Sequence, residues 1–409
     1  MTDLEALYRD LHSHPELAFA EHRTAGIVVE RLSALGLDVT QGIGGTGVVG
    51  VLENGEGPTV LLRADMDALP VLEDTGLEWA STQTATDHTG AVVPVMHACG
   101  HDIHITCLVG AVEALVAARD EWTGTLVALF QPAEEHGGGA QVMIEDGLYE
   151  KVPVPDVVLG QHVTPLPAGM LGAHSGAAMA AVDTMEVTLH GRGGHGSRPE
   201  TTIDPVVMAA ATVMRLQTIV SRDIAPQETS VVTVGSMHAG SANNIIAAEA
   251  KLGISVRSFS EEVRARVLGS VERIVSAEAA ASGATVPPTI EFGERYPVTV
   301  NDPAATERAT AAFAAEFGEE RLFDPGAISG SEDVGNLATA ATAVKGSTVP
   351  LVYWMLGGGD PATVAAALAA GTMEAHIPSN HSPHFAPLAQ PTIDTGVRAL
   401  VVAAREWLA

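Results

Sequence analysis

Three short apolar runs, each followed at once by polar side chains, constrain the fold of this chain most strongly. They read TVLLRA at 59–64, TLVALF at 125–130 and DVVLGQH at 156–162. Their length suits buried strands, and the carboxyl ends of strands in an open α/β sheet meet at one edge, where ligands bind. The polar residues at these strand ends are Asp65, Asp67, Glu134, Glu135 and His162. The sequence therefore predicts an α/β fold with a polar site at one edge of the sheet.

The remaining periodicity predicts two domains. Residues 101–118 form an apolar helical segment in the first of them. Near residue 182 the chain changes to alternating polar and apolar residues, which is typical of antiparallel strands. The segments that follow read β-α-β-β-α-β, the pattern of a small two-layer, ferredoxin-like domain. We predict a mixed-sheet, three-layer α/β domain from residues 1–181 and 296–409, with a two-layer α+β domain inserted at 182–295.

The surplus of acidic residues argues against two classes of partner. Lys and Arg number 21 and Asp and Glu number 50, so the net charge is −29. Nucleic acids and anionic membranes repel such a surface. No apolar run approaches the ~20 residues of a membrane span, and the start MTDLEALYRD lacks the basic and apolar regions of a signal peptide. Because the two cysteines form no disulfide framework, we expect a protein of the reducing cytoplasm.

The stretch MHACGHDIH at 96–104 is the densest cluster of metal-binding side chains. Cys99 and His101 are one residue apart, and thiolate and imidazole suit borderline metals such as Zn²⁺, Mn²⁺ or Co²⁺. The alternative is a buried structural thiol beside a hydrogen-bonded histidine. The His-Asp pair also occurs in HD-type phosphohydrolases, but those proteins are mainly helical. Cys107 lies within an apolar helical segment and is predicted to be a core residue.

The adjacent acids Glu134 and Glu135 favour a hydrolytic metal site. Adjacent side chains point in different directions, so one acid can bind metal while the other holds the attacking water. The three glycines that follow would let a ligand approach closely. A solvated acidic loop is the alternative interpretation. His162 alone fits a hydrogen-bonded histidine equally well, and the loop NHSPHF offers two histidines without indicating which one binds metal.

Further polar residues are candidates for supporting roles. Asp65 and Asp67 can be ligands or can orient a ligand histidine. His195, in the glycine-flanked loop GRGGHGSRP, can donate to an oxyanion or can be an exposed loop histidine. Asn244 and Arg257 are suited to hold a substrate carboxylate or carbonyl, although Arg257 also fits a surface ion pair.

Eight motifs in order along the chain resemble the M20 metallopeptidase family. The resemblance is closest to its amidohydrolase branch, which includes hippurate hydrolases, aminoacylases and indole-acetyl-amino-acid hydrolases. The motifs are LHSHPELAFAE, RADMDALPV, MHACGHDIH, QPAEE, GRGGHGSRP, GSANNII, GSED and NHSPHF.

The resemblance implies a hydrolase with two divalent metal ions. Cys99 would bridge the metals, Glu135 and His381 would complete one of them, and His101 and His162 the other. Glu134 would be the general base, and Asp67 matches an acid that orients a ligand. The metals would be Mn²⁺ or Zn²⁺, while Co²⁺ and Ni²⁺ also suit this ligand set.

The resemblance also implies a substrate and an assembly. The inserted domain resembles the family's dimerisation or lid domain, whose histidine and asparagine point to His195 and Asn244. We predict that the chain forms a homodimer or higher homo-oligomer and cleaves the amide of a small N-acyl amino acid to a carboxylic acid and a free amino acid. A dipeptidase of the same family and a non-catalytic, metal-stabilised binding protein are the alternatives.

Overall fold

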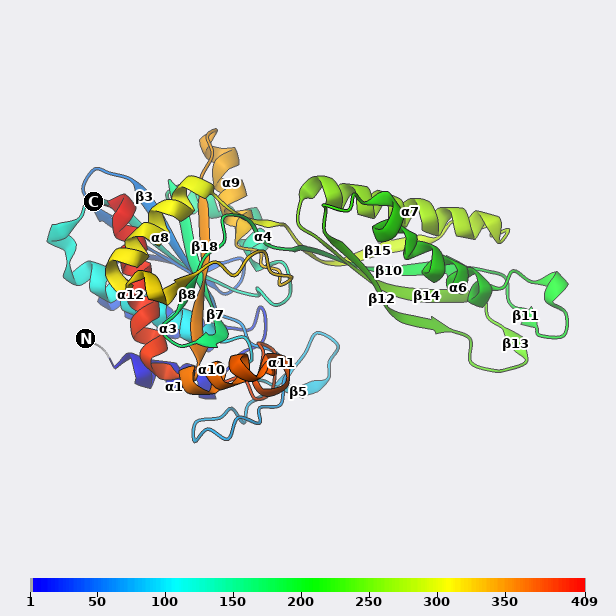
Figure 1. Ribbon diagram of the computed structural model, residues 1–409, viewed down its shortest axis with the longest axis horizontal. Coiled ribbons are helices and arrows are strands. Elements are labelled where there is room, and N and C mark those ends of the chain that lie inside the picture. The colour runs from blue at the N-terminus through cyan, green and yellow to red at the C-terminus, as the bar shows by residue number, and fades with distance from the viewer. Residues whose placement is uncertain (1–2, 409) are drawn as a thin grey trace. The chain divides into compact units, whose positions relative to one another are not determined.

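The computed structural model describes residues 3–408, which form two compact units (Figure 1). The first unit comprises the chain up to Ala178, Val300–Gly326 and the chain from Asp333 onward. The second comprises Met179–Thr299 and Ala327–Glu332. Within residues 3–408, no helix combines the length and the apolar character that crossing a bilayer requires.

An eight-stranded mixed sheet forms the centre of the first unit, in the order β1-β2-β6-β3-β7-β18-β8-β17. Its middle strands β6, β3, β7 and β18 are parallel to one another, whereas β2 pairs antiparallel with β1 and β6, and β8 pairs antiparallel with β18. The predicted strands at 59–64, 125–130 and 156–162 are confirmed as β3, β6 and β7. The strand bounds are β1 Asp38–Ile43, β2 Gly47–Asn54, β3 Thr59–Asp65, β6 Gly124–Gln131, β7 Val157–Pro167, β8 Leu171–Gly172, β17 Leu322–Phe323 and β18 Leu351–Gly359.

Helices cover both faces of this sheet. Helix α12 packs against α3 and α8 on one face, and α4 packs against α9 on the other (Figure 1). Helix α3 is buried along most of its length and mainly apolar beyond its first turn, as suits a helix packed between the sheet and α12. The main helices are α1 Leu4–Ser13, α2 His22–Ala34, α3 His101–Ala117, α4 Gly139–Glu145, α8 Pro303–Phe317, α9 Gly335–Lys345, α10 Pro361–Ala370 and α12 Ala389–Leu408. Short elements are α5 Leu148–Lys151, α11 Met373–His376 and the hairpin of β4 Thr84–Thr86 with β5 Val92–Pro94.

The second unit is a four-stranded antiparallel sheet, in the order β12-β14-β10-β15, with helices α6 and α7 packed against it. The β-α-β-β-α-β pattern expected from the sequence is confirmed. Its helices start with side-chain caps, from Asp204 for α6 and Ser260 for α7. The elements are β10 Ala181–His190, α6 Pro205–Leu216, β12 Ser230–Ala239, β14 Glu249–Ser258, α7 Glu261–Ala281 and β15 Thr289–Tyr296, with the short pair β11 Gly194–His195 and β13 Ile245–Ile246.

Candidate metal centre

The carboxyl ends of β3, β6 and β7 bring the predicted acids and histidines of the first unit together. Strand β7 runs on to Pro167, beyond the strand end expected at His162. Its pairing with β3 stops at Gly160, so His162 lies past that pairing, while on its other side β7 remains paired with β18. Helix α3 begins at His101, beside these strand ends. The side chains therefore meet at the edge where an open parallel sheet binds ligands.

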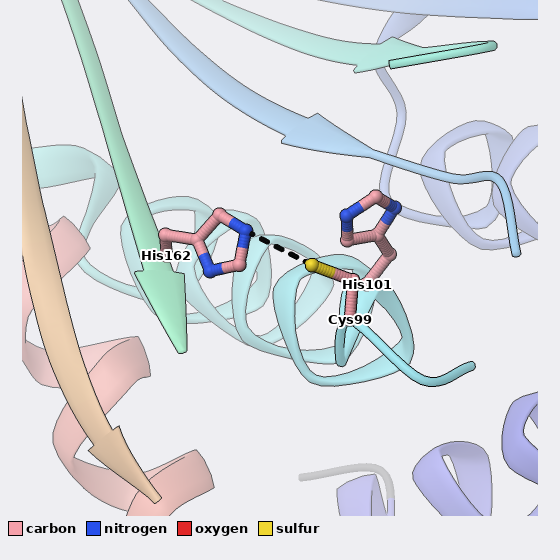
Figure 2. Close-up of side chains that lie close together, drawn as sticks. All are labelled: Cys99, His101 and His162. Carbon is pink, nitrogen blue, oxygen red and sulfur yellow. Dashed lines mark hydrogen bonds between the residues drawn. The ribbon is translucent and has the colours of Figure 1, made fainter. Parts of the chain in front are cut away.

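Two groups of possible ligand atoms share the Cys99 sulfur. One consists of Cys99, His101 and His162, the other of Cys99, Glu135 and His381, and in each group the atoms lie within 4.8 Å of one another. The Cys99 Sγ lies 3.5 Å from His162 Nε2, with His101 at the start of α3 beside it (Figure 2). On the other side, His381 Nε2 lies 3.2 Å from Glu135 Oε1. Such a set of sulfur, nitrogen and oxygen donors is what a borderline divalent metal prefers.

Hydrogen bonds orient the histidines of this cluster. His162 Nδ1 lies 2.8 Å from the Val163 carbonyl oxygen and donates to it, so Nε2 keeps its lone pair toward Cys99. His104 Nε2 accepts the Val163 N–H at 2.8 Å, and its Nδ1 bonds the Asp65 carboxylate. The same carboxylate forms a buried ion pair with Arg63 at 2.8 Å. His104 and Asp65 therefore lie behind the donor atoms and hold them in place.

Glycine geometry at the start of α3 keeps Cys99 and His101 close to β7. Gly100 has φ +80°, and an added Cβ there would lie 2.4 Å from the Val163 side chain. Any other residue would therefore meet both a strained backbone and a clash. The glycine lets the turn between Cys99 and His101 pack directly on β7.

Asp67 holds the acidic loop that follows β6. Its two carboxylate oxygens accept the backbone N–H groups of Glu134 and Glu135, each at 3.0 Å. Asp67 also lies 3.4 Å from His101 Nδ1. The Glu134 side chain is buried, with 5% of its surface exposed. Asp67 thus connects the loop that carries both glutamates to a ligand histidine, whereas the sequence left open whether it is itself a ligand.

Buried polar atoms test whether this site fits a metal ion. Among residues 3–408, both ring nitrogens of His101 and Oε1 of Glu135 are buried without a hydrogen bond of acceptable geometry. Uncompensated burial of such atoms is costly. A divalent cation would satisfy Glu135 Oε1 and His101 Nε2, which lie 3.8 Å apart, while His101 Nδ1 faces the Asp67 carboxylate, so the donor set fits the metal.

Burial and neighbouring charges shift the ionisation of two candidate ligands. Burial raises the pKa of the Cys99 thiol, and the charges of Glu135, Glu134 and Asp65 raise it further, well above its usual range. Burial disfavours the charged form of His101, but Asp65, Asp67 and Glu135 outweigh burial and raise its pKa to about 10. A bound cation would reverse both tendencies, because it stabilises a thiolate and a neutral imidazole.

The loop NHSPHF brings one histidine to the cluster and directs the other elsewhere. His381, at φ +70°, donates its backbone N–H to the Ala98 carbonyl at 2.8 Å. His384 instead contacts the Asp74 carbonyl. Asn380, which sequence reasoning missed, donates to the backbone oxygens of Cys99 at 3.2 Å and Val163 at 3.1 Å. An asparagine next to a candidate ligand was the available signal.

The candidate residues of the second unit lie in two places, at the β11–β13 pair and on strand β14. His195 on β11 is exposed and lies beside Asn244, whose carbonyl accepts the Gly196 N–H at 2.8 Å. His195 Nδ1 accepts the Ser197 N–H at 3.1 Å, which leaves the proton of a neutral ring on Nε2. Arg257 on β14 donates to the Ser329 carbonyl and to the Ser331 hydroxyl at 3.3 Å. Within residues 3–408, Arg257 does not form the surface ion pair that was the alternative.

An α/β fold with sulfur, imidazole and carboxylate donors around a buried acid at the sheet edge defines a metallohydrolase architecture. A model of peptidase family M20/M25/M40 matches residues 61–378. The chain belongs to this family.

Known relatives agree with that assignment over most of the chain. The chain is 40% identical over 305 residues to thermostable carboxypeptidase 1 of Saccharolobus solfataricus, covering 73% of this chain and 74% of the relative. It is 39% identical over 336 residues to hippurate hydrolase of Campylobacter jejuni, covering 81% of this chain and 84% of that relative. A solved Bacillus subtilis structure, described as a dinuclear metal-binding peptidase of the M20 family, has a TM-score of 0.74 at 28% identity and covers 99% of this chain and 98% of that one.

Proposed function

We propose that the protein is a metal-dependent amidohydrolase that cleaves N-acyl amino acids to a carboxylic acid and a free amino acid. One observation carries the proposal. The candidate donors converge in the first unit beside a buried glutamate, in a chain 39% identical to a hippurate hydrolase. The donors are Cys99, His101, Glu135, His162 and His381.

Two divalent ions, Mn²⁺ or Zn²⁺, would occupy this site. Cys99 belongs to both ligand groups and would be shared, with Glu135 and His381 at one ion and His101 and His162 at the other. When bound, the ions would polarise the substrate carbonyl and lower the pKa of the attacking water. Co²⁺ and Ni²⁺ suit the same donors, so metal availability selects among them.

Glu134 is the general base in this proposal. Its backbone is held by Asp67, so its carboxylate has a defined position beside the ligand Glu135. Glu134 takes a proton from the attacking water as the new C–O bond forms. It then delivers that proton to the amine nitrogen as the C–N bond breaks. Because the side chain is buried, bulk water does not compete for the proton.

The second unit would act as a dimerisation or lid domain. The Nε2–H of His195 would steady the tetrahedral oxyanion, and Asn244 and Arg257 would bind the substrate carbonyl or carboxylate. A homodimer or higher homo-oligomer would complete the site. A cytoplasmic location is consistent with Cys99 and Cys107, which are both free thiols.

A peptidase that accepts dipeptides is the second candidate, because a relative of similar identity carries the name carboxypeptidase. A panel of hippurate, N-acetyl amino acids and dipeptides separates the two, since only the acyl group differs. Preference for dipeptides over every N-acyl substrate would overturn the first proposal. Full metal loading with no hydrolysis of any member would favour a metal-stabilised binding protein.

The glutamate assignment is tested by Glu134→Gln. We expect kcat to fall by about two to four orders of magnitude, while the metal content measured by mass spectrometry stays at the wild-type level. Glu30→Gln, on the exposed side of α2, is the matched control and should have unchanged kcat. Near-normal turnover in Glu134→Gln would falsify the assignment.

A further inference from the structure

The motif HSHPELAFAE contains two glutamates that the proposed mechanism does not use. Glu16 caps helix α2, since its carboxylate accepts the N–H groups of Arg23 at 2.9 Å and Thr24 at 2.8 Å. Glu21 is the residue at the start of that helix, yet its side chain makes no capping bond. Because Glu16 satisfies the helix terminus, the Glu21 carboxylate is available for other contacts.

Glu21 is fully buried and reaches the loop after β6. Its Oε1 accepts the Ala133 N–H at 2.9 Å and the Phe19 N–H at 2.9 Å, and its Oε2 accepts the hydroxyl of the buried Thr46. Three hydrogen-bond donors meet this buried carboxyl group, so all three contacts together define its position.

The loop that Glu21 binds is strained. Three described residues other than glycine have positive φ, namely Phe19 at 62°, Ala133 at 50° and His381 at 70°. Glu21 bonds the backbone N–H of the first two. Such conformations cost about 1–3 kcal/mol each and persist only where neighbouring groups enforce them. Glu21 therefore binds the backbone at two of these strained positions.

Two buried carboxylates therefore bind three consecutive backbone N–H groups. Glu21 binds that of Ala133, and Asp67 binds those of Glu134 and Glu135. We infer that Glu21 is a positioning residue, which fixes the backbone before the base Glu134 and the ligand Glu135 and so sets where both side chains point. The expected effect on catalysis rests on the proposed function. The expected effect on the backbone of residues 133–135 does not.

The test compares Glu21→Gln with Glu16→Gln, which lies in the same motif. Glutamine keeps the shape of Glu21 but replaces one acceptor oxygen with a donor NH₂ group, so it cannot accept hydrogen bonds from Ala133, Phe19 and Thr46 together. We expect kcat per metal-loaded, folded enzyme to fall about 10- to 100-fold with KM changed less than about twofold, because a 1 Å misplacement costs up to about 10²-fold. Glu16→Gln should lower the melting temperature and leave kcat unchanged. Thr46→Val, which keeps both backbone bonds, should have a smaller effect on kcat than Glu21→Gln.

A second readout does not depend on activity. Hydrogen–deuterium exchange of the metal-loaded protein should be faster at residues 133–135 in Glu21→Gln and unchanged there in Glu16→Gln. Unchanged exchange at these amides would overturn the inference, as would faster exchange with normal kcat. Equal losses of kcat in both variants would also overturn it, since they would indicate a general structural role. If the wild-type protein hydrolyses nothing in the substrate panel, the proposed function fails, and the exchange measurement still decides whether Glu21 holds the loop.

Discussion

A single added methyl group at Gly139 should move the catalytic loop. Gly139 begins α4, and a Cβ built on it would lie 1.6 Å from the Pro132 carbonyl oxygen and 2.8 Å from the Pro132 carbonyl carbon. The obstacle is backbone, so no side-chain rotation relieves it. The carbonyl must move by about 1.4 Å to reach even the 3.0 Å limit below which such contacts are essentially not seen. Pro132 lies two residues before Glu134, so this movement reaches the base.

The size of the effect follows from that displacement. A 1 Å misplacement of catalytic groups costs about 10²-fold in rate, and overpacking costs about 1–3 kcal/mol of stability. We therefore expect Gly139→Ala to lower kcat by about 10²-fold or more, with a modest decrease in melting temperature. The sequence suggested that the glycines admit a ligand, whereas the structure shows that Gly139 admits the backbone of its own loop.

The assay is kcat against an N-acyl amino acid, normalised to folded, metal-loaded enzyme. Gly138→Ala is the matched control, because a Cβ there meets nothing within 4 Å and its φ is −154°. It should retain kcat within a few-fold. Wild-type kcat in a fully folded Gly139→Ala would refute the reasoning, since the loop would then tolerate a displacement that we take to be disabling.

Three further predictions concern stability and metal dependence. Burial raises the pKa of Asp183, but its ion pairs, foremost that with Arg264, outweigh burial and lower it; this stabilisation is present above the unfolded pKa of about 3.9 and is lost as pH falls through the lower folded value. Asp183→Asn should therefore lower the free energy of unfolding at pH 7 by about 2 kcal/mol, and the difference from wild type should narrow below about pH 4. The control Glu186→Gln removes an exposed pair with Lys251 and should change stability little at either pH. A difference for Asp183→Asn that persists undiminished at low pH contradicts this prediction. Gly396→Ala places a Cβ 2.5 Å from the Cys107 sulfur and should lower the free energy of unfolding by about 1–3 kcal/mol without changing kcat. Wild-type stability of this variant would contradict the prediction. Chelation should abolish turnover and Mn²⁺ or Zn²⁺ should restore it, and activity that survives complete metal removal would count against the mechanism.

Local patterns were enough to predict the architecture of both units. Strands β3, β6 and β7 follow from short apolar runs, because burial on both faces leaves few polar positions within them. Residue type also made Cys99 and the Glu134-Glu135 pair candidates for metal chemistry, but a structural thiol and a solvated acidic loop fitted the same residues until the resemblance was considered. Residue type did not assign a role to each candidate. It left His381 and His384 equivalent as metal ligands, and only the family resemblance favoured His381.

The long-range contacts of the site were decided by tertiary structure. Glu21 and Ala133 are 112 residues apart, Asn380 and Cys99 are 281 apart, and no spacing rule connects them. Periodicity reports which face of an element is buried, but not which buried carboxylate meets which N–H group. These pairings depend on how β3, β6 and α2 pack. The need for glycine at residue 139 depends on one contact with the Pro132 carbonyl. The sequence alone therefore identifies the groups that can bind metal and move a proton, and the fold determines which of them lie within reach of each other.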